Sequence, residues 1–286
     1  MEVAGFLGGK ATSLSFETEM CSSLYKGGKG EMFQEEFQAV CKAGVGKNNL
    51  LKKNPAGYFI SSMVAGMFIS FGSFITFVMG TPLKEANDPM MKAVMAFCFA
   101  AALSLVIAAG AELFTGNNFV MASASLKKEV SWGDTIKLWI VCYVGNFVGS
   151  ILCVLVFQLT GIPTGAVGEH FAASAATKMG LPLGQMFTRA IFCNILVCLA
   201  VWCSIKLKNE VARLIMVFWC IFVFMICGFE HSVANMSIMG VGLLNAGDAA
   251  VSIGGYFYNL LVVTLGNMVG AILFVSVPYY MISKEK

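Results

Sequence analysis

Two adjacent ionisable residues, Glu230 and His231, stand inside an apolar run that extends from Leu214 to Gly247. An ionisable side chain at membrane depth is energetically costly, so it usually indicates a functional site. An imidazole can donate a hydrogen bond to an anion and can exchange a proton near neutral pH. The pair therefore predicts that His231 lines a pathway for an anion. The alternative is a histidine that only holds a loop by bonding to the neighbouring backbone.

A second carboxylate, Glu112, interrupts an earlier apolar run from Ala93 to Leu126 in the same way. A carboxylate directed into the pathway would repel anions. We therefore expect Glu112 and Glu230 to pin their segments through hydrogen bonds to backbone donors, with a place in the pathway wall as the alternative.

The surroundings of the two carboxylates share the pattern G-x-E-x4-N. Its two copies are Gly110, Glu112 and Asn117, and Gly228, Glu230 and Asn235. A second pattern, G-N-x-V-G, contains Asn146 in its first copy and Asn267 in its second, and the two patterns keep the same order. This agreement indicates an internal duplication. Asn146 and Asn267 either cap freed backbone groups or face the pathway.

The spacing of charged residues predicts six membrane crossings. Each of the two interrupted runs has 34 residues, and a straight helix of that length would measure about 51 Å against a hydrocarbon core of about 30 Å. We therefore expect each run to form one broken crossing plus a loop. The four remaining crossings are expected between Lys53 and Lys84, between Lys137 and Glu169, over Leu183 to Leu207, and between Asp248 and Lys284.

Three crossings in each half make the repeat an inverted one, because an odd number of crossings brings the second copy into the membrane from the opposite face. Inverted repeats with paired broken helices place a substrate site near the bilayer midplane. The sequence therefore predicts an all-α integral membrane protein with broken second and fifth helices, which is the architecture of a pore or a transporter.

The composition excludes a soluble enzyme, because 58% of the 286 residues are hydrophobic and only 12% are charged, against roughly 25% charged residues in soluble domains. Fifteen of the 19 Lys and Arg residues fall on the side of the predicted termini, which places both termini in the cytoplasm. We divide the chain into a cytoplasmic segment (1–53) with an amphipathic helix over Glu31–Asn49, a channel domain (54–283) and a cytoplasmic tail (284–286). The net charge of +3 gives no indication of nucleic-acid binding.

No motif for a metal, a cofactor or an enzymatic nucleophile is present. Eight of the ten cysteines lie in apolar runs and no C-x-x-C pair occurs, so we interpret them as buried small hydrophobes. Neither H-E-x-x-H nor G-x-S-x-G is found, which argues against an intramembrane enzyme. A water or glycerol channel is the main alternative, since Asn54-Pro55-Ala56 spells the aquaporin tripeptide. This tripeptide has no partner in the second half, so we interpret it as a coincidence.

Several further residues are ambiguous from spacing alone. His170 lies beside Glu169 in a predicted external loop, where a functional role is not expected. Lys178 in the same loop is either a solvated cation or one that concentrates anions at a pore mouth. Four bulky apolar residues near the breaks would ordinarily be core or lipid-facing residues: Phe99, Leu103, Phe114 and Phe224.

Four segments together resemble the formate/nitrite transporter family, which also includes hydrosulfide channels. They are G-A-E-L-F-T at 110–115, C-N-I-L-V-C-L-A-V-W at 193–202, G-F-E-H-S-V-A-N-M at 228–236, and G-N at 266–267. The resemblance covers the chain from about residue 25 onward. It implies an aquaporin-like bundle of six transmembrane helices that assembles as a homopentamer in the cytoplasmic membrane. Each protomer would pass small monovalent anions of weak acids, such as formate, nitrite or hydrosulfide.

The resemblance also implies roles for single residues. His231 would be the pore histidine with Glu230 as its neighbour, and Thr115 would lie near it in a mobile loop. Asn267 would line the pore, and Lys178 would be the basic vestibule residue. The implied constrictions are Leu103 with Phe224 on the cytoplasmic side and Phe99 with Phe114 on the periplasmic side.

Overall fold

The computed structural model describes residues 33–284, and within that part of the chain all regular structure is helical. Most of the predicted 1–53 segment and the last two residues of the predicted tail lie outside the described residues. The helices are α2 (Gln34–Lys53), α3 (Pro55–Glu85), α4 (Met91–Leu105), α5 (Phe114–Leu126), α6 (Trp132–Leu159), α7 (Ala166–Met179), α8 (Leu183–Lys206), α9 (Glu210–Ile226), α10 (Ser232–Leu244), α11 (Ile253–Ala271) and α12 (Val277–Ile282). Single π-helical turns at Val106–Gly110 and Ile272–Ser276 extend α4 and join α11 to α12.

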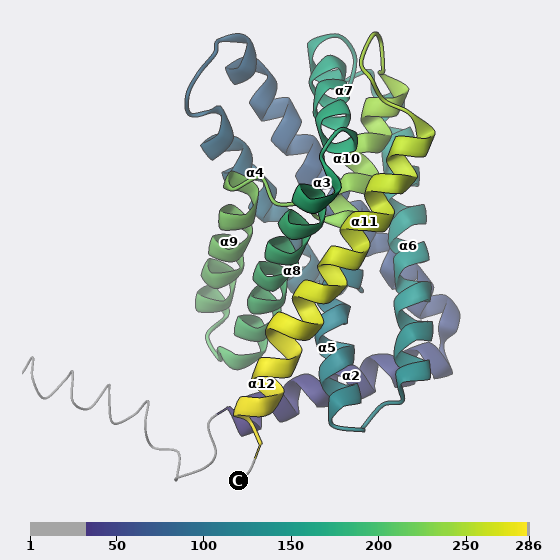
Figure 1. The fold of residues 1–286 in the computed structure, drawn as a ribbon, viewed down its shortest axis with the longest axis vertical. Coiled ribbons are helices and arrows are strands. Elements are labelled where there is room, and N and C mark those ends of the chain that lie inside the picture. Colours follow the sequence, from purple (N-terminus) through teal and green to yellow (C-terminus); the bar gives the residue numbers. More distant parts are fainter. Residues whose placement is uncertain (1–32, 285–286) are drawn as a thin grey trace, which may run out of the picture.

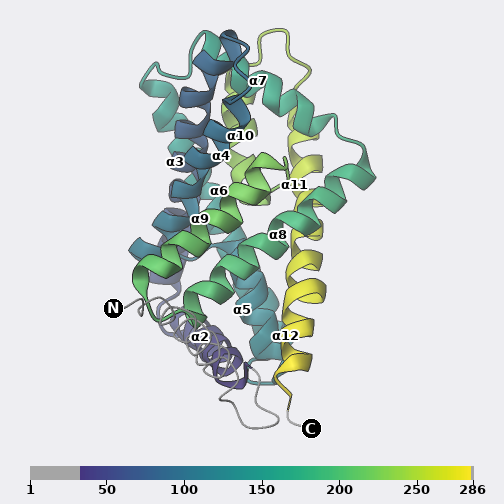
Figure 2. The same cartoon turned by 90° about the vertical axis from the view of Figure 1, so that its left-hand side faces the viewer.

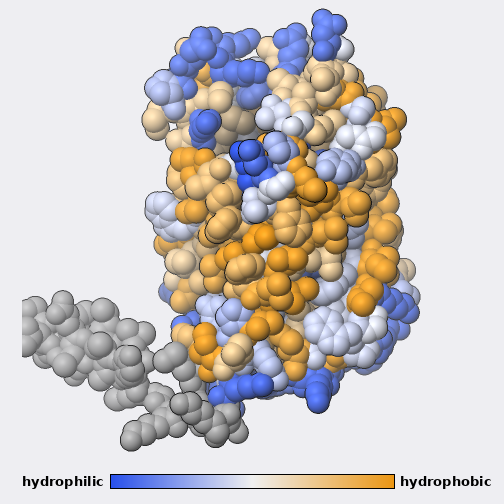
Figure 3. Space-filling model, in the orientation of Figure 1, coloured by the Kyte–Doolittle hydropathy of each residue, from blue (hydrophilic) through white to orange (hydrophobic). Residues whose placement is uncertain are grey.

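Five helical stretches are long and apolar enough to cross a membrane. They are Pro55–Glu85, Met91–Gly110, Trp132–Leu159, Leu183–Lys206 and Ile253–Ile282. On the face shown in Figure 3, apolar residues cover most of the middle of the molecule and polar residues gather at its two ends. The remaining predicted crossing is divided between α9, with 17 residues, and α10, with 13, so neither piece is a full span by length.

Both broken helices are interrupted next to their carboxylates. After α4 and its π-turn, an extended segment at 111–113 precedes α5, and residues 227–231 separate α9 from α10. Gly110 and Gly228 have φ angles of 79° and 69°, a backbone conformation that residues with a Cβ rarely adopt. The shared glycine of G-x-E-x4-N therefore allows the chain to turn sharply where each helix stops.

The G-N-x-V-G glycines bring helices into close contact within each half. A Cβ atom on Gly149 of α6 would clash with the carbonyl oxygen of Met63 on α3. In the second half, a Cβ atom on Gly270 of α11 would clash with the carbonyl oxygen of Ile191 on α8. The second motif thus sets the close approach of the long helices that frame each break.

Each half carries one helix more than the sequence analysis predicts for the repeat. Helix α2 packs against α5 at the end of the molecule where α12 also finishes, and α7 packs against α10 at the opposite end (Figures 1 and 2). We name these the α2 end and the α7 end. The repeating unit therefore runs as a covering helix, a long helix, a broken helix and a second long helix.

The tripeptide Asn54-Pro55-Ala56 has a local role between α2 and α3. The Asn54 side chain accepts a hydrogen bond from the Gly57 backbone N–H at 2.9 Å, and Pro55 occupies the first helical position of α3. Asn is a favoured N-cap, and proline suits the first position because the amide there needs no partner. This supports the interpretation of the aquaporin-like tripeptide as a coincidence.

Candidate functional site

The first break is held by an ion pair that the sequence analysis misses. The Lys47 ammonium on α2 lies 2.7 Å and 2.8 Å from the two Glu112 carboxylate oxygens. The Asn117 side-chain amide also donates to this carboxylate, at 2.8 Å, and to the Tyr58 hydroxyl at 3.0 Å. The donors to the Glu112 carboxylate are therefore side chains, not the backbone groups that the sequence analysis predicts.

The second break repeats this arrangement at the α7 end. The Lys178 ammonium lies 2.9 Å and 3.0 Å from the Glu230 carboxylate oxygens, and the Asn235 amide donates to Glu230 at 2.7 Å. A second hydrogen bond from Asn235 reaches the Asn259 side-chain oxygen at 2.8 Å, and Asn259 donates to the Lys178 carbonyl oxygen at 2.9 Å. Lys178 is thus paired, not the lone cation that its place in a loop suggests.

Asn146 and Asn267 use their amide groups to cap freed backbone at the two breaks. Asn146 donates to the carbonyl oxygens of Ser62 at 2.7 Å and Glu112 at 2.9 Å, and it accepts from the Phe114 N–H at 2.9 Å. Asn267 makes the equivalent bonds to Ala190 at 2.8 Å, Glu230 at 3.0 Å and Ser232 at 3.0 Å. Both donor hydrogens of each amide are therefore committed to the backbone, and neither residue lines one of the two cavities described below.

His231 connects the two halves of the chain. One of its ring nitrogens bonds to the backbone of α10 and the other lies against α5. Its Nδ1 accepts a hydrogen bond from the Ala234 N–H at 3.0 Å, which makes His231 the N-cap of α10. Its Nε2 lies 3.0 Å from the Thr115 hydroxyl oxygen on α5. Because Nδ1 accepts, the ring proton of the neutral imidazole must be on Nε2, where it points at Thr115. His231 is 3% exposed, so this proton is presented inside the protein.

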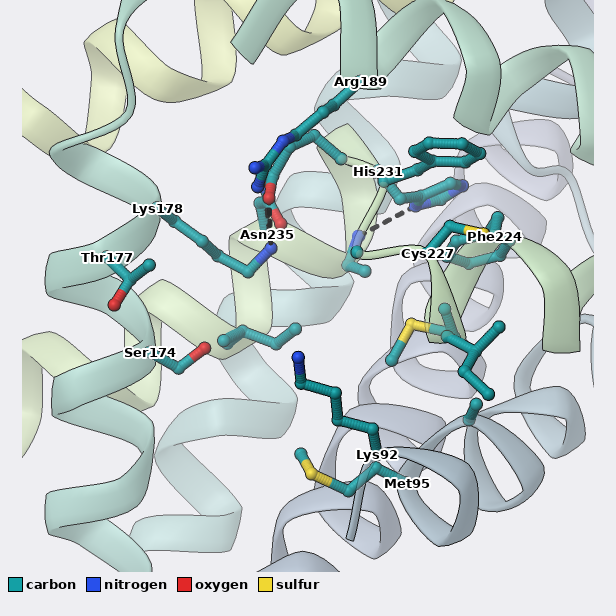
Figure 4. Close-up of a pocket in the computed structure, with 18 of the residues that line it drawn as sticks. Lys92, Met95, Ser174, Thr177, Lys178, Arg189, Phe224, Cys227, His231 and Asn235 are labelled. Carbon is teal, nitrogen blue, oxygen red and sulfur yellow. Dashed lines mark hydrogen bonds and ion pairs between the residues drawn. The ribbon is translucent and has the colours of Figure 1, made fainter. Parts of the chain in front are cut away.

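A cavity of about 420 Å³ opens from the α7 end to the second break, and we call it the α7-side cavity. His231 and Phe224 form part of its wall, and Figure 4 shows the side chains of Lys92, Lys178 and Arg189 extending toward the same space. A cavity of about 370 Å³ at the first break, the α2-side cavity, is lined by Lys47, Glu112 and Leu103 among others. No lining residue belongs to both cavities.

The four bulky apolar residues expected at the constrictions are buried. Phe99, Leu103, Phe114 and Phe224 are each at most 3% exposed. The Phe224 ring packs edge-on against Phe99 with centroids 5.7 Å apart and lies parallel to the His231 ring at 6.0 Å. Phe224 lines the α7-side cavity and Leu103 lines the α2-side cavity, and the Phe224 ring also contacts Phe99, which the sequence analysis assigns to the other constriction.

His170 is buried beside the α7-side cavity instead of lying in an open loop. Its Nδ1 is 3.0 Å from the Thr81 hydroxyl, which itself donates to the Phe77 carbonyl oxygen at 2.7 Å. Since that hydroxyl proton is already used, Nδ1 of His170 is the donor to Thr81. Burial, with a smaller contribution from Lys84, lowers the pKa of His170 to about 4. The ring is therefore neutral at physiological pH.

Three basic residues of the site escape sequence reasoning. Lys47 is 65 residues from its partner Glu112, in a helix that no motif connects to the break. Lys92 and Arg189 belong to no motif in the sequence, and both line the α7-side cavity. The internal duplication is the one sequence feature that could have indicated Lys47. If a lysine from a preceding helix pairs with Glu230, the repeat predicts a second lysine that pairs with Glu112.

Comparison with known proteins shows similarity along nearly all of the described chain. A family profile described as formate/nitrite transporter matches residues 34–281. The nitrite transporter NirC of Salmonella typhimurium is 33% identical over 234 residues, which covers 81% of this chain and 85% of NirC. A solved structure titled FNT family ion channel matches with a TM-score of 0.82 and 31% identity, covering 87% of this chain and 99% of that one. Another, titled pentameric formate channel with formate bound, matches with a TM-score of 0.68 and 30% identity, covering 81% and 98%.

Proposed function

This chain belongs to the formate/nitrite transporter family, and we propose that it passes small monovalent anions of weak acids, namely formate, nitrite or hydrosulfide, across the cytoplasmic membrane. Its relatives are transporters and channels, and several apolar spans make it a multi-pass membrane protein. The name of one similar structure supports a homopentamer, and we propose that each protomer contains one pathway. In this proposal α9 and α10 complete a sixth crossing, and the α2 end, which carries both described chain ends, faces the cytoplasm.

The contact between His231 and Thr115 carries the proposal. It joins the N-terminal turn of α5 to that of α10, so two half-helices from opposite ends of the molecule begin at one place. Helix N-termini carry partial positive charge and favour an anion. The Nε2–H of His231 adds a hydrogen-bond donor at the same place. An anion that replaces the Thr115 oxygen as acceptor gains part of the stabilisation that it loses with its water.

Hydrogen-bond donation suits His231 better than proton transfer. Protonating the ring would put a hydrogen on Nδ1, which faces the Ala234 N–H at 3.0 Å and would lose that cap. A neutral imidazole cannot give up its only ring proton near neutral pH, because the product would be an imidazolate. We therefore assign to His231 the role of a neutral donor that stays protonated at Nε2 while the ion passes.

The buried apolar residues expected at the constrictions act as the barrier that the ion must cross. Removing a bare charge from water without compensation is expensive, and apolar constrictions exclude water by dewetting. Phe224 stacks on the His231 ring and contacts Phe99, and Phe114 directly precedes Thr115, which His231 contacts. The carboxylates of Glu112 and Glu230 are each neutralised by a lysine, so they do not repel an approaching anion.

Flux measurements in proteoliposomes test this function directly. We expect uptake of formate, nitrite or hydrosulfide, with little passage of chloride or glycerol, at external pH values of about 5 and about 7.5 on either side of the usual histidine pKa of about 6.5. Passage of glycerol without anions would instead support a glycerol channel of aquaporin type. Equal passage of chloride and formate would contradict selectivity for weak-acid anions.

Two histidine variants separate the donor from the cap. His231→Asn retains a side-chain oxygen that can cap α10 but presents no Nε2–H to Thr115, whereas His231→Phe removes both functions. We expect both variants to lose most anion flux and only the phenylalanine variant to lose thermal stability. Normal flux in the folded asparagine variant would refute the role of His231 as a donor.

A further inference from the structure

Two cations of the α7-side cavity have no anionic partner. Lys178 is paired with Glu230, but the side chains of Lys92 and Arg189 make no hydrogen bond or ion pair with any residue between 33 and 284. Arg189 is only partly exposed, in a helix that is apolar enough to cross a membrane. An arginine within such a helix usually faces a water-filled cavity and meets a charged ligand there.

The backbone fixes where the Arg189 side chain starts. The Arg189 carbonyl oxygen accepts a hydrogen bond from the Glu230 N–H at 3.4 Å, and the next carbonyl, that of Ala190, accepts from Asn267 at 2.8 Å. Both bonds tie this turn of α8 to the second break. Figure 4 shows the Arg189 side chain extending from α8 toward Lys178 and Asn235.

The duplication shows that the fold itself does not require an arginine at this position. In the first half, the Glu112 N–H donates to the Ser61 carbonyl oxygen at 3.3 Å, so Ser61 holds the place of Arg189. Ser61 lines the α2-side cavity. Lys92 stands twenty residues before Glu112, and the residue twenty before Glu230 is the acidic Glu210. Both unpaired cations are therefore confined to the α7 end.

This difference gives the two cavities different charges. The α7-side cavity is lined by three basic side chains and one carboxylate, whereas the α2-side cavity is lined by one lysine and one carboxylate. Neutralising Glu230 does not require Arg189, because Lys178 contacts both of its oxygens and Asn235 supplies another donor. Arg189 and Lys92 thus remain available for a mobile anion.

The guanidinium suggests which anion. Its parallel N–H groups form a rigid fork that matches two oxygens held in one plane, and this bidentate geometry is not available to an ammonium group. Formate, nitrite and larger monocarboxylates present such a pair of oxygens, whereas hydrosulfide and chloride offer a single atom. The partly exposed Ser174 of α7 also lines the cavity and adds a hydroxyl group nearby.

We propose that Arg189, assisted by Lys92, forms an anion-binding subsite in the α7-side cavity that captures planar two-oxygen anions before they reach His231. The inference rests on the proposed function and adds a selection step to it. Carboxylates and nitrite are held by the guanidinium fork, while hydrosulfide is attracted only by the net charge. Arg189 thereby favours two-oxygen anions at low substrate concentration.

Concentration-dependent uptake into proteoliposomes tests the subsite. Arg189→Lys keeps the charge and removes the fork, so we expect it to raise KM for formate and nitrite about fivefold, to change the maximal rate less, and to leave KM for hydrosulfide within about twofold. Lys208→Gln, which removes an exposed cation beyond the opposite end of α8, is the matched control with unchanged kinetics. Equal KM shifts for formate and hydrosulfide, or no shift in Arg189→Lys, would refute the fork while leaving the proposed function intact. A wild-type protein that takes up neither formate nor nitrite would refute both proposals.

The reactivity of a cysteine in the α7-side cavity toward charged reagents measures the electrostatic potential there without a flux assay. Cys227 is exposed and lines the α7-side cavity. We expect an anionic methanethiosulfonate to modify Cys227 faster than a cationic reagent of similar size. Arg189→Gln and Lys92→Gln should each lower this rate ratio severalfold, and Arg189→Lys should preserve it. An unchanged ratio in both glutamine variants would show that these cations do not act on ions in the cavity.

Discussion

The two breaks share one scaffold but differ in what the scaffold presents. At the α2 end Lys47, Glu112 and Asn117 form a cluster with separations of 2.7–2.8 Å, and at the α7 end Lys178, Glu230 and Asn235 form one with separations of 2.7–3.0 Å. The residue that follows each carboxylate differs, since Leu113 stands in the first half where His231 stands in the second. Leu113 offers no side-chain cap to α5, whereas His231 caps α10. Both halves thus contain the Lys–Glu–Asn cluster that holds the break, whereas only the second half contains the histidine proposed to bind the anion.

Burial also separates the two clusters. The side chains of Lys178 and Glu230 are 16% and 4% exposed, against 23% and 12% for Lys47 and Glu112. Leaving one member of a buried pair without its partner costs more than breaking an exposed pair. Removing the lysine of the ion pair should therefore lower the free energy of unfolding more at the α7 end than at the α2 end.

The largest effect is expected from Lys178→Met, which leaves Glu230 buried without its counter-ion. We expect a loss of about 3–5 kcal/mol in the free energy of unfolding, measured by thermal unfolding of the protein in detergent. The double variant Lys178→Met/Glu230→Gln should recover much of this loss. A single variant as stable as the wild type would show that the pair is not a buried support.

Acidification should act on the α7 end through His170. Its folded pKa of about 4 lies below the unfolded value of about 6.5, so only the unfolded chain binds the proton between these pH values. Stability that is fully present above pH 6.5 is therefore lost as the pH falls toward 4, by at most about 3 kcal/mol.

His170→Gln provides the comparison, because glutamine can still donate to Thr81 but does not titrate. We expect the melting temperature of this variant to depend less on pH between 6.5 and 4 than that of the wild type. Equal pH dependence in both proteins would rule out His170 as a source of acid sensitivity.

Lys47→Met is the counterpart of the first prediction at the α2 end. Because Lys47 and Glu112 are more exposed, we expect a smaller loss of about 1–2 kcal/mol. Thermal unfolding next to Lys178→Met measures the ratio of the two effects. A larger loss of unfolding free energy for Lys47→Met than for Lys178→Met would show that burial does not decide which ion pair contributes more to stability.

The smallest effect concerns two thiols at opposite ends of the molecule. Burial, together with Glu129, raises the pKa of Cys41 on α2 to about 12, whereas Cys227 is exposed in the α7-side cavity. At pH 8 we expect a maleimide to modify Cys227 at least about a hundred times faster than Cys41, because the thiolate is the reactive form. Peptide mass spectrometry follows both sites, and comparable rates would indicate that α2 detaches from its support.

Features of the fold that depend on short stretches of sequence, such as the two helix breaks, could be predicted from the sequence. Both breaks were predicted at their carboxylates, because a charge inside a 34-residue apolar run is visible without tertiary information. The all-helical fold is confirmed, and both predicted breaks are present. The amphipathic helix was expected over Glu31–Asn49, and α2 instead occupies Gln34–Lys53 because Asn54 and Pro55 begin the next helix.

Partners that come from distant segments were not accessible in this way. The choice between capping and pathway lining for Asn146 and Asn267 depends on carbonyl groups that are 34 to 84 residues away in the sequence. The ring contact between Phe224 and Phe99 depends on how α4 packs against α9. In the sequence Lys92 and Arg189 resemble ordinary surface charges, and only the folded structure shows that both line the same cavity.

The supports of each break all lie within one half of the chain. Every partner described here for the Glu112 cluster precedes residue 160, and every partner for the Glu230 cluster follows residue 165. During synthesis the first half can therefore neutralise its buried carboxylate before the second half has left the ribosome. Insertion can then proceed in two steps, and the contact between Thr115 and His231 forms last, when the completed halves meet.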